Sequence, residues 1–228
     1  MLYVIATPIG NLGDMTFRAV DVLKQADVVA CEDTRRTRAL LSYFEINRPG
    51  VMLSCREGVE ARAAAKVLEY LRSGRNVALC SDAGYPGISD PGYRLVSAAT
   101  AEGIDPVVIP GASAVPAALI ASGLPSSSYT FKGYPPRKKG PAFRFFKEEA
   151  NTKHTLVVFE SPMRVAKTLK TALEALGDRR AAVCAELTKK FEKTTRDYLS
   201  ELAGAFEGRK VKGEVTLVIA GSHPKFTR

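Results

Sequence analysis

Short apolar runs that stop in loops rich in glycine and proline are the feature that most constrains how this chain can fold. The clearest is the run 76–81, Asn-Val-Ala-Leu-Cys-Ser, which stops in the loop 82–92, Asp-Ala-Gly-Tyr-Pro-Gly-Ile-Ser-Asp-Pro-Gly. A continuous run of small apolar residues favours a strand covered on both faces, as in a parallel sheet. The density of glycine and proline after it excludes helix and sheet and predicts a loop of fixed path. In open α/β sheets, ligands bind at such loops.

The same succession of strand, loop and helix continues through the first half of the chain. We expect strands at 2–6, 27–31, 51–54, 76–81 and 106–109, and helices at 16–26, 59–73 and 93–102, with further helical segments around Leu40 and over 115–121. Thr16 is expected to cap the helix 16–26, and Gly74 is expected to end the helix 59–73. Asp90 is expected to cap a helix that begins at Pro91. This alternation predicts a parallel, doubly wound domain with right-handed crossovers.

The character of the sequence changes after residue 112. We expect strands at 129–132, 154–159, 181–187 and 213–220, helices at 163–176 and 198–206, and a basic helix containing Phe143, Phe145 and Phe146. A basic loop stiffened by proline, 133–141, precedes that helix. The chain is therefore predicted to form two α/β domains, 1–112 and 113–228.

The positive charge belongs to the second of these domains. Residues 1–112 carry 12 Lys and Arg against 13 Asp and Glu, a balance of −1, whereas residues 113–228 carry 21 against 11, a balance of +10. Their sum is the net charge of +9. A field of this kind suits a polyanionic partner, and solubility is the alternative explanation.

The composition argues against several other classes of protein. The start of the chain lacks a basic segment and reaches Thr7-Pro8 too early for a signal peptide, and no apolar run reaches membrane-spanning length, so we expect a cytoplasmic protein. Four widely spaced cysteines without a C-x-x-C pair, and only two histidines, predict reduced packing residues and no metal site. A Cys–His nucleophilic pair stays open, although neither residue type lies in a glycine-rich loop.

Neither a phosphate-binding P-loop nor a strand-linked G-x-G-x-x-G is present, yet the loops taken together resemble a known family. In order and over nearly the whole chain, they are similar to the tetrapyrrole methylase-like (class III) methyltransferases and, within these, to the ribosomal RNA small subunit methyltransferase I family. The resemblance is carried by the motifs TPIGNL at 7–12, EDTR at 32–35, SDAG at 81–84 with DPG at 90–92, PGASA at 110–114, GLP at 123–125, FES at 159–161, ELTK at 186–189 and KGE at 212–214.

The resemblance implies transfer of a methyl group from S-adenosylmethionine to a ribose 2′-hydroxyl of a cytidine in 16S rRNA, within the 30S subunit. It also implies a mixed sheet in the C-terminal domain, a cofactor cleft between the domains, and a homodimer. Cofactor contacts are expected from loop residues, namely Pro8, Ile9, Gly10, Asp82, Ala83, Gly84, Asp90, Gly111, Ala112, Ser113, Leu124 and Pro125. An uncharged adenine and a zwitterionic methionine need close backbone and a few acceptors, which glycine loops with aspartate supply.

A ribose hydroxyl needs a base, or a cation that stabilises the forming alkoxide. Glu160 and Lys189, each after a strand of the second domain, are the candidates, and Glu32 and Asp33 are alternatives on the first. A helix cap or surface ion pair is an equally good explanation for each of these residues.

Arg35 and the run Arg137, Lys138 and Lys139 are candidates for phosphate contacts. The nearby phenylalanines suit core packing better than base stacking.

The chain departs from the family pattern at three places, which leaves the substrate open. Residues 54–58 read Ser-Cys-Arg-Glu-Gly where many members have His-Asn-Glu, Tyr85 replaces a usual threonine, and the chain ends at Arg228 without the extension of longer members. The alternatives are a small-molecule, tetrapyrrole-like methylase of the same fold and an RNA-binding protein without turnover.

Overall fold

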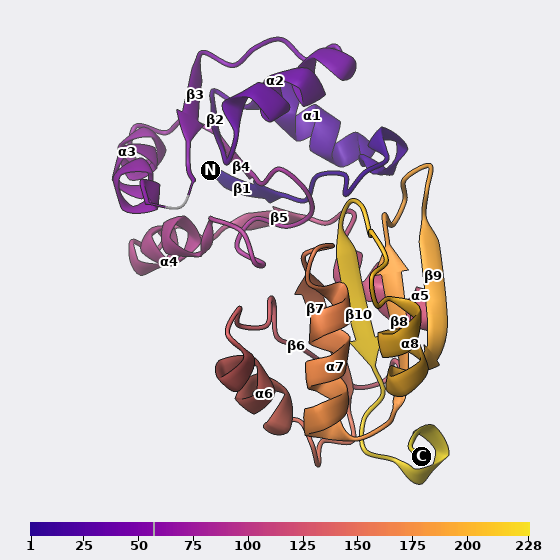
Figure 1. Ribbon diagram of the computed structural model, residues 1–228. Helices are drawn as coiled ribbons and strands as arrows, with labels where there is room; N and C mark the ends of the chain where they lie inside the picture. The colour runs from indigo at the N-terminus through magenta and orange to yellow at the C-terminus, as the bar shows by residue number, and fades with distance from the viewer. Residues whose placement is uncertain (57) are drawn as a thin grey trace. The chain divides into compact units, whose positions relative to one another are not determined.

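The computed structural model describes residues 1–56 and 58–228 and divides the chain into two compact units, Met1–Ser113 and Ala114–Arg228 (Figure 1). The domain boundary expected from the sequence lies one residue earlier. Glu57, which belongs to the departing stretch 54–58, lies outside the described residues. Within the described part of the chain, no helix combines the length and apolar character that a membrane crossing requires.

A five-stranded sheet in the order β3-β2-β4-β1-β5 forms the centre of the first unit. Every neighbouring pair of strands is parallel. The strands are β1 (Leu2–Ile5), β2 (Val28–Cys31), β3 (Val51–Ser54), β4 (Val77–Cys80) and β5 (Val107–Ile109). All residues of β2 and β4 are buried, which explains why these strands appear in the sequence as unbroken apolar runs.

Helices cover both faces of this sheet. On one face, Ala19 and Leu23 pack with Ile5 and Cys80, and on the other Val67 and its neighbours pack with Leu79 and the rest of their cluster. The helices are α1 (Phe17–Gln25) and α2 (Thr34–Tyr43) on the first face and α3 (Glu60–Arg72) and α4 (Tyr93–Ala101) on the second, with a short 3-10 helix, η1, at Leu12–Asp14. The prediction of a parallel, doubly wound domain is confirmed.

The helix ends test the local predictions. The side chain of Thr16 accepts a hydrogen bond from the backbone N–H of Ala19, 3.2 Å away, so Thr16 is the N-cap that the sequence indicated. The expected cap at Asp90 is wrong, because α4 begins at Tyr93 and Glu60 of α3 supplies the acceptor. The Oε1 atom of Glu60 accepts hydrogen bonds from the backbone N–H groups of Gly92 at 2.9 Å and Arg94 at 3.1 Å.

The second unit is built on a mixed sheet in the order β6-β7-β10-β8-β9. Only the pair β6 and β7 is parallel, and the other pairs are antiparallel. The strands are β6 (Tyr129–Phe131), β7 (Thr155–Glu160), β8 (Arg180–Ala185), β9 (Lys193–Tyr198) and β10 (Val215–Ile219). The sequence did not predict β9, and the mixed sheet agrees with the expected fold class.

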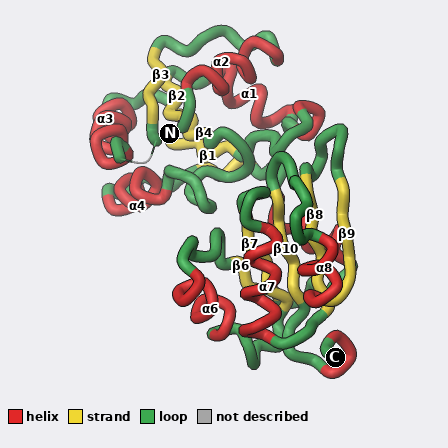
Figure 2. The backbone as a smooth tube through the Cα atoms, viewed as in Figure 1, coloured by secondary structure: helices red, strands yellow, loops and turns green. Residues whose placement is uncertain are grey.

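Helices again lie on both faces of the sheet. Figure 1 shows α7 and α8 in front of the strands and α5 behind them. The helices are α5 (Ala114–Ser122), α6 (Lys139–Lys147), α7 (Val165–Leu176) and α8 (Leu199–Ala205), with a 3-10 helix, η2, at Pro224–Phe226. The loops that join these elements, including the long one from α8 to β10, are drawn in green in Figure 2.

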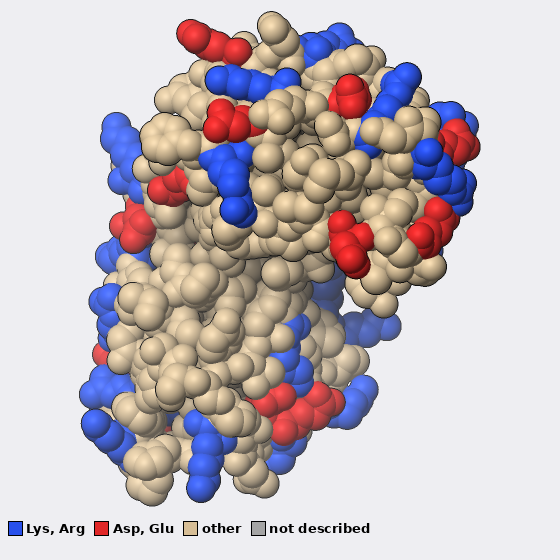
Figure 3. Space-filling model, turned by 180° about the vertical axis from the view of Figure 1, so that it is seen from behind, with Lys and Arg blue, Asp and Glu red and all other residues tan. Residues whose placement is uncertain are grey.

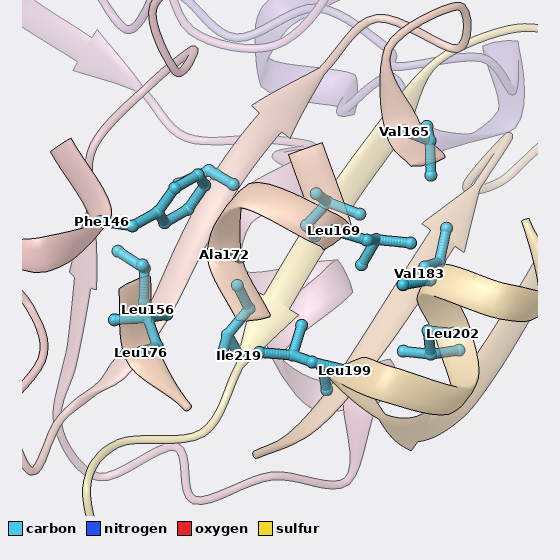
Figure 4. Close-up of a cluster of buried hydrophobic side chains, with 14 of the residues drawn as sticks. Phe146, Leu156, Val165, Leu169, Ala172, Leu176, Val183, Leu199, Leu202 and Ile219 are labelled. Carbon is cyan, nitrogen blue, oxygen red and sulfur yellow. The ribbon is translucent and has the colours of Figure 1, made fainter. Parts of the chain in front are cut away.

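The core of this unit lies between the sheet and helices α6, α7 and α8. Figure 4 shows Leu169 of α7, Leu199 and Leu202 of α8 and Phe146 of α6 gathered with strand residues such as Val183. Phe146 is fully buried, with 0% of its surface exposed. It therefore anchors α6 in the core, and the half-buried Phe143 and Phe145 pack against the same cluster.

Replacing Phe146 by alanine should lower the free energy of unfolding by about 3–5 kcal/mol, because the change removes buried surface and leaves a cavity. Phe191→Ala is the matched control in the same unit, since 75% of that side chain is exposed. Its effect should stay within about 0.5 kcal/mol. Urea unfolding followed by circular dichroism measures both variants, and equal losses would contradict the described core.

Candidate active site

Parallel pairing places the carboxyl ends of all five strands of the first unit at one edge of its sheet. Strands β4, β1 and β5 are neighbours, so the loops that follow them emerge side by side. These loops contain ten of the twelve residues expected to bind the cofactor, namely Pro8, Ile9, Gly10, Asp82, Ala83, Gly84, Asp90, Gly111, Ala112 and Ser113. The structure therefore brings together residues that are far apart in the sequence.

Hydrogen bonds join the loop after β1 to the loop after β4. The backbone N–H of Thr7 donates to the carbonyl of Gly84 at 2.9 Å, and the N–H of Gly84 donates to the carbonyl of Thr7 at 3.0 Å. The buried Thr7 hydroxyl donates to the Ser81 carbonyl at 3.2 Å, and the Ser81 hydroxyl lies 3.1 Å from the Gly84 carbonyl. The two loops therefore form one short piece of antiparallel structure.

Tyr85 joins the loop after β4 to the loop after β5. Its hydroxyl accepts a hydrogen bond from the backbone N–H of Gly111 at 3.1 Å. A Cβ atom at Gly111 would lie 3.1 Å from both the Cβ and the carbonyl oxygen of Ala6, so a bulky residue there would press on the end of β1. The tyrosine that departs from the family pattern thus has a structural role.

The groups that these loops offer to a ligand are mainly backbone groups. The side chains of Pro8 and Ile9 are buried, whereas Gly10 is exposed and Gly111 and Ala112 are half-buried. Gly84 has a φ of +76°, a left-handed conformation that favours glycine. A loop with few protruding side chains lets a ligand approach the main chain closely.

Three acidic residues lie where β2 and β4 end. The Asp82 carboxylate accepts from the backbone N–H of Asp33 at 3.1 Å and lies 3.4 Å from the Arg36 guanidinium. Glu32 accepts from the backbone N–H of Asp82 at 3.4 Å. Burial, followed by the charge of Asp82, raises the pKa of Glu32. The hydrogen bond from the backbone N–H of Arg35 is the largest cause of the lowered pKa of Asp33, which caps α2.

The segment 85–92 folds back on itself. The backbone N–H of Gly87 donates to the carbonyl of Pro91 at 3.2 Å, and a Cβ atom at Gly92, whose φ is +142°, would lie 2.9 Å from the Gly87 nitrogen. These glycines are therefore required by packing within the loop. Asp90 is half-buried in this segment.

The last two expected cofactor residues belong to the second unit. The backbone N–H of Leu124 donates to the Ser122 hydroxyl at 3.0 Å, and the Pro125 carbonyl accepts from the Thr155 hydroxyl at 2.7 Å. These bonds fix the turn that leads from α5 toward β6. A cofactor contact from this turn stays a prediction.

Glu160 is held at the end of β7 by several partners. Its side chain is completely buried, accepts from the backbone N–H of Ser161 at 2.6 Å and from the Thr168 hydroxyl, and lies 3.2 Å from the Arg164 guanidinium. A carboxylate engaged in this way stabilises the start of α7. These contacts favour a structural role over the predicted catalytic one.

Lys189 lies in the loop after β8, at the same end of the sheet as Glu160. Its Nζ atom is 2.9 Å from Oε1 of Glu186 and 2.8 Å from Oε2 of Glu214. Partial burial favours the neutral amine, but the hydrogen bonds and charges of the two carboxylates outweigh it and raise the pKa of Lys189. The lysine is therefore a fixed cation at neutral pH and is not a proton acceptor.

The backbone around Lys189 is strained. Glu186 has a φ of +53° and Thr188 a φ of +66°, which are unfavourable for residues with a side chain. The Thr188 hydroxyl is buried and is the one such side-chain atom among the described residues without a hydrogen-bond partner. Strain and an orphaned polar atom concentrate at functional sites, which supports a functional role for the loop.

Gly213 is required by this arrangement. A Cβ atom there would lie 1.8 Å from Oε1 of Glu186, the atom that holds Lys189 and also accepts from the backbone N–H of Glu214 at 3.0 Å. The motifs ELTK and KGE are therefore parts of one cluster.

The residues expected to contact RNA differ from one another in exposure and in pairing. Arg35 is 87% exposed, and Arg137 and Lys138 are exposed in the loop before α6, whereas Lys139 is paired at 3.1 Å with Glu174 of α7. Figure 3 shows one face of the second unit on which lysine and arginine side chains lie along the margins of a largely uncharged centre. Of the three phenylalanines in α6, Phe146 is core, and Phe143 and Phe145 pack against it.

The described residues contain no cluster of three or more histidine, cysteine, aspartate or glutamate side chains that could hold a metal ion. All four cysteines are buried free thiols. Burial raises the pKa of each, to about 11 for Cys55. Neutral, buried thiols are poor nucleophiles.

Comparison with known proteins identifies the family. The family model for Tetrapyrrole (Corrin/Porphyrin) Methylases matches residues 1–203. The chain is also 45% identical over 224 residues to "Ribosomal RNA small subunit methyltransferase I" of Halalkalibacterium halodurans, covering 98% of this chain and 77% of the relative. Proteins of the same name from Bacillus subtilis and Thermotoga maritima are 43% and 41% identical, covering 98% and 96% of this chain and 76% and 98% of each relative.

The chain belongs to the ribosomal RNA small subunit methyltransferase I family. It is accordingly a methyltransferase, and the resemblance inferred from its motifs is confirmed.

Solved structures confirm the fold of this family member. The uroporphyrin III C-methyl transferase from Thermus thermophilus superposes with a TM-score of 0.65 at 22% identity and covers 96% of both chains. The methyltransferase CobJ gives a TM-score of 0.70 at 17% identity, covering 97% of this chain and 94% of that one. At these identities the likeness concerns the fold alone.

Sequence reasoning missed the partners that give this methyltransferase its site geometry. Glu186 and Glu214 hold Lys189, and the Tyr85 hydroxyl holds Gly111. Both glutamates lie in motifs that the sequence analysis singled out, Glu186 in ELTK with Lys189 and Glu214 in KGE. Their membership of these motifs was the signal that could have identified them. Nothing in the sequence pointed to the contact of Tyr85.

Tyr85→Phe should loosen the loop after β5, because the backbone N–H of Gly111 loses its acceptor. The expected loss of stability is about 0.5–1.5 kcal/mol. Hydrogen exchange followed by mass spectrometry should show faster exchange at the peptide containing Gly111. Tyr93→Phe, at a side chain that is 73% exposed, is the control. Unchanged exchange in Tyr85→Phe would contradict the loop contact.

Gly213→Ala should destabilise the protein more than Gly208→Ala does. Both glycines have a left-handed φ, +75° and +66°, but nothing lies within 4 Å of a Cβ atom at Gly208. The difference between the two variants therefore measures the clash with Glu186, and we expect an additional loss of about 1–3 kcal/mol. Equal melting temperatures would mean that Glu186 moves aside freely.

Proposed function

We propose that this protein transfers a methyl group from S-adenosylmethionine to the 2′-hydroxyl of a cytidine ribose in 16S rRNA within the 30S subunit. The observation that carries the proposal is the 41–45% identity, over nearly the whole chain, to proteins named for ribosomal RNA methylation. The +10 charge balance of residues 113–228 supports a polyanionic substrate.

The loops of the first unit fit S-adenosylmethionine. Asp82, with 18% of its side chain exposed, is an acceptor for the methionine ammonium group or the ribose hydroxyls. The half-buried backbone at Gly111, Ala112 and Ser113 offers hydrogen-bonding groups to an uncharged adenine. When bound, the cofactor supplies an electrophilic methyl group on a sulfonium. Pro8, Ile9 and Gly10 complete the proposed site, with Ala83, Gly84, Asp90, Leu124 and Pro125.

The chain's own residues must position the ribose hydroxyl, exclude water and accept the proton that the hydroxyl loses. We assign to Lys189 the role of a fixed cation that stabilises the negative charge developing on the ribose oxygen. Glu32 suits removal of the proton better than Glu160, because burial raises the pKa of the Glu32 carboxyl above its usual value and the Glu160 carboxylate is fully engaged by its partners.

The proposal includes a homodimer and a cytoplasmic location, where the small ribosomal subunit is available. Light scattering of the purified protein tests the dimer. Two other functions are separable by experiment. A tetrapyrrole-like methylase would bind RNA weakly and with little dependence on salt, and a binding protein without turnover would bind RNA and transfer nothing.

The deciding experiment combines 30S subunits, from cells that lack the gene, with purified protein and S-adenosylmethionine labelled in its methyl group. We expect label in 16S rRNA and a single modified cytidine when methylated nucleotides are located. If the protein binds RNA tightly but no label enters RNA, the function of an RNA-binding protein without turnover is supported instead.

Asp82→Ala should weaken S-adenosylmethionine binding by about tenfold or more, because hydrogen bonds to a charged acceptor are worth about 1.5–3 kcal/mol. Isothermal titration calorimetry measures the affinity. Asp105→Ala, at an exposed residue of the same unit, controls for the lost charge. Equal affinities in the two variants would remove Asp82 from the proposed site.

Lys189→Gln should lower the rate of methyl transfer by about 100-fold, a typical loss for one electrostatic contact in the transition state. Since the raised pKa keeps Lys189 protonated at neutral pH, the loss should be the same from pH 6 to 9. Lys225→Gln, at an exposed residue outside the candidate site, should keep the full rate. A loss that appears only at one end of the pH range would contradict a fixed cation.

A further inference from the structure

The second unit contains a pocket of about 450 Å³ that none of the residues predicted from the sequence explains. It lies on the sheet face that carries α7 and α8, between the β8–β9 hairpin and the loop that follows α8. Figure 2 shows the course of these two backbone segments. Val183 and Ala185 of β8, with Thr195 and Lys193 opposite them on β9, line it. Helix α8 ends at Ala205, and the next residue, Phe206, also lines the pocket.

Four cations surround the pocket, so positive charge converges at this place. Lys193 comes from β9, and Arg209, Lys210 and Lys212 come from the loop after α8. Some lysines elsewhere in the unit do have carboxylate partners, as in the pairs at Lys132, Lys139, Lys170 and Lys189. None of the four pocket cations forms an ion pair within residues 1–56 and 58–228. Like charges that converge without partners favour an anionic ligand.

The one acid that lines the pocket does not neutralise these cations. Glu186 is already bound to Lys189 and to the backbone N–H of Glu214, and its pKa is lowered chiefly by the hydrogen bond from Lys189. The same side chain therefore borders both the pocket and the Lys189 cluster. A ligand in the pocket would lie next to the residue to which we assign the cationic role.

Aromatic residues give the pocket a second kind of contact. Phe206 is buried at its base with the Arg209 guanidinium 5.5 Å from its ring centre. Phe191 borders the pocket with 75% of its side chain exposed, and the Lys190 ammonium lies 5.7 Å from its ring centre. An exposed ring among cations is the arrangement that binds single-stranded nucleic acid, by stacking a base between phosphate contacts.

We propose that this pocket binds a single-stranded segment of the RNA substrate, with one base on Phe191 and the adjoining phosphates on Lys193, Arg209, Lys210 and Lys212. The inference rests on the proposed function, since it assigns the surface that holds the RNA beside Lys189. A continuous strand fits better than an isolated anion, because the cations are spread over a strand and a loop and the ring is at the border.

The test compares the full-length protein with Arg209→Gln/Lys212→Gln and with a control of equal charge, Lys153→Gln/Lys225→Gln. Both control residues lie at the opposite end of the sheet, beside the start of β7 and the end of β10. Binding of a fluorescein-labelled single-stranded oligoribonucleotide is followed by anisotropy at several salt concentrations. The pocket variant should bind about tenfold more weakly, and its slope of log K against log salt should fall by about 1.4, two contacts at about 0.7 each. The control should match the wild type.

Phe191 separates stacking from charge. Phe191→Ala should weaken RNA binding by about fivefold or more without changing the salt slope, and Phe191→Trp should restore it, since stacking of one base is worth about 1–3 kcal/mol. A salt slope that falls equally in the pocket and control variants would overturn the proposal. Competition by cytidine monophosphate as strong as that by the oligonucleotide would also overturn it, in favour of a small anionic ligand.

Methyl transfer to 30S subunits and calorimetric binding of S-adenosylmethionine are measured in parallel for every variant. If the wild-type protein methylates 30S subunits but the pocket variant binds RNA with unchanged affinity, the pocket assignment is overturned and the proposed function stands. Wild-type protein that neither binds RNA nor methylates it would overturn the proposed function as well.

Discussion

Two reciprocal backbone hydrogen bonds between Thr7 and Gly84 underlie the candidate site of the first unit. A parallel sheet by itself only brings loops to the same edge, and each loop could still follow its own path. The reciprocal pair fixes the loop after β1 against the loop after β4, and the Tyr85 hydroxyl extends the connection to the loop after β5. Because these contacts use backbone groups and one tyrosine hydroxyl, the site keeps its form with few large side chains, which leaves the main chain accessible to a ligand.

Much of the fold could be predicted because it depends on local patterns. Buried strands such as β2 and β4 are unbroken apolar runs, and Thr16 forms its cap within three residues. The strand β9 was missed because Lys-Thr-Thr-Arg-Asp-Tyr has no apolar run, as suits an edge strand with exposed charges. The cap of α4 was assigned wrongly because its acceptor, Glu60, is 32 residues from Gly92.

The candidate site was less predictable, since its chemistry depends on which side chains meet. The motifs correctly marked the loops that converge on one edge of the first sheet, but burial and pairing decide what a charged residue in such a loop can do. Glu160 and Lys189 appeared equivalent in the sequence. The structure distinguishes them: the Glu160 carboxylate is buried among hydrogen-bond donors, whereas Lys189 is a cation between two glutamates.

The absence of a side chain at Gly213 has a consequence for how sequences of this kind can diverge. Glu186 occupies the volume that a Cβ atom at position 213 would need. The two positions are therefore coupled: a larger residue at 213 requires the Glu186 side chain to move or to be shortened, and either change releases Lys189 from one of its two carboxylates. Divergence at this pair would thus alter the electrostatics around Lys189.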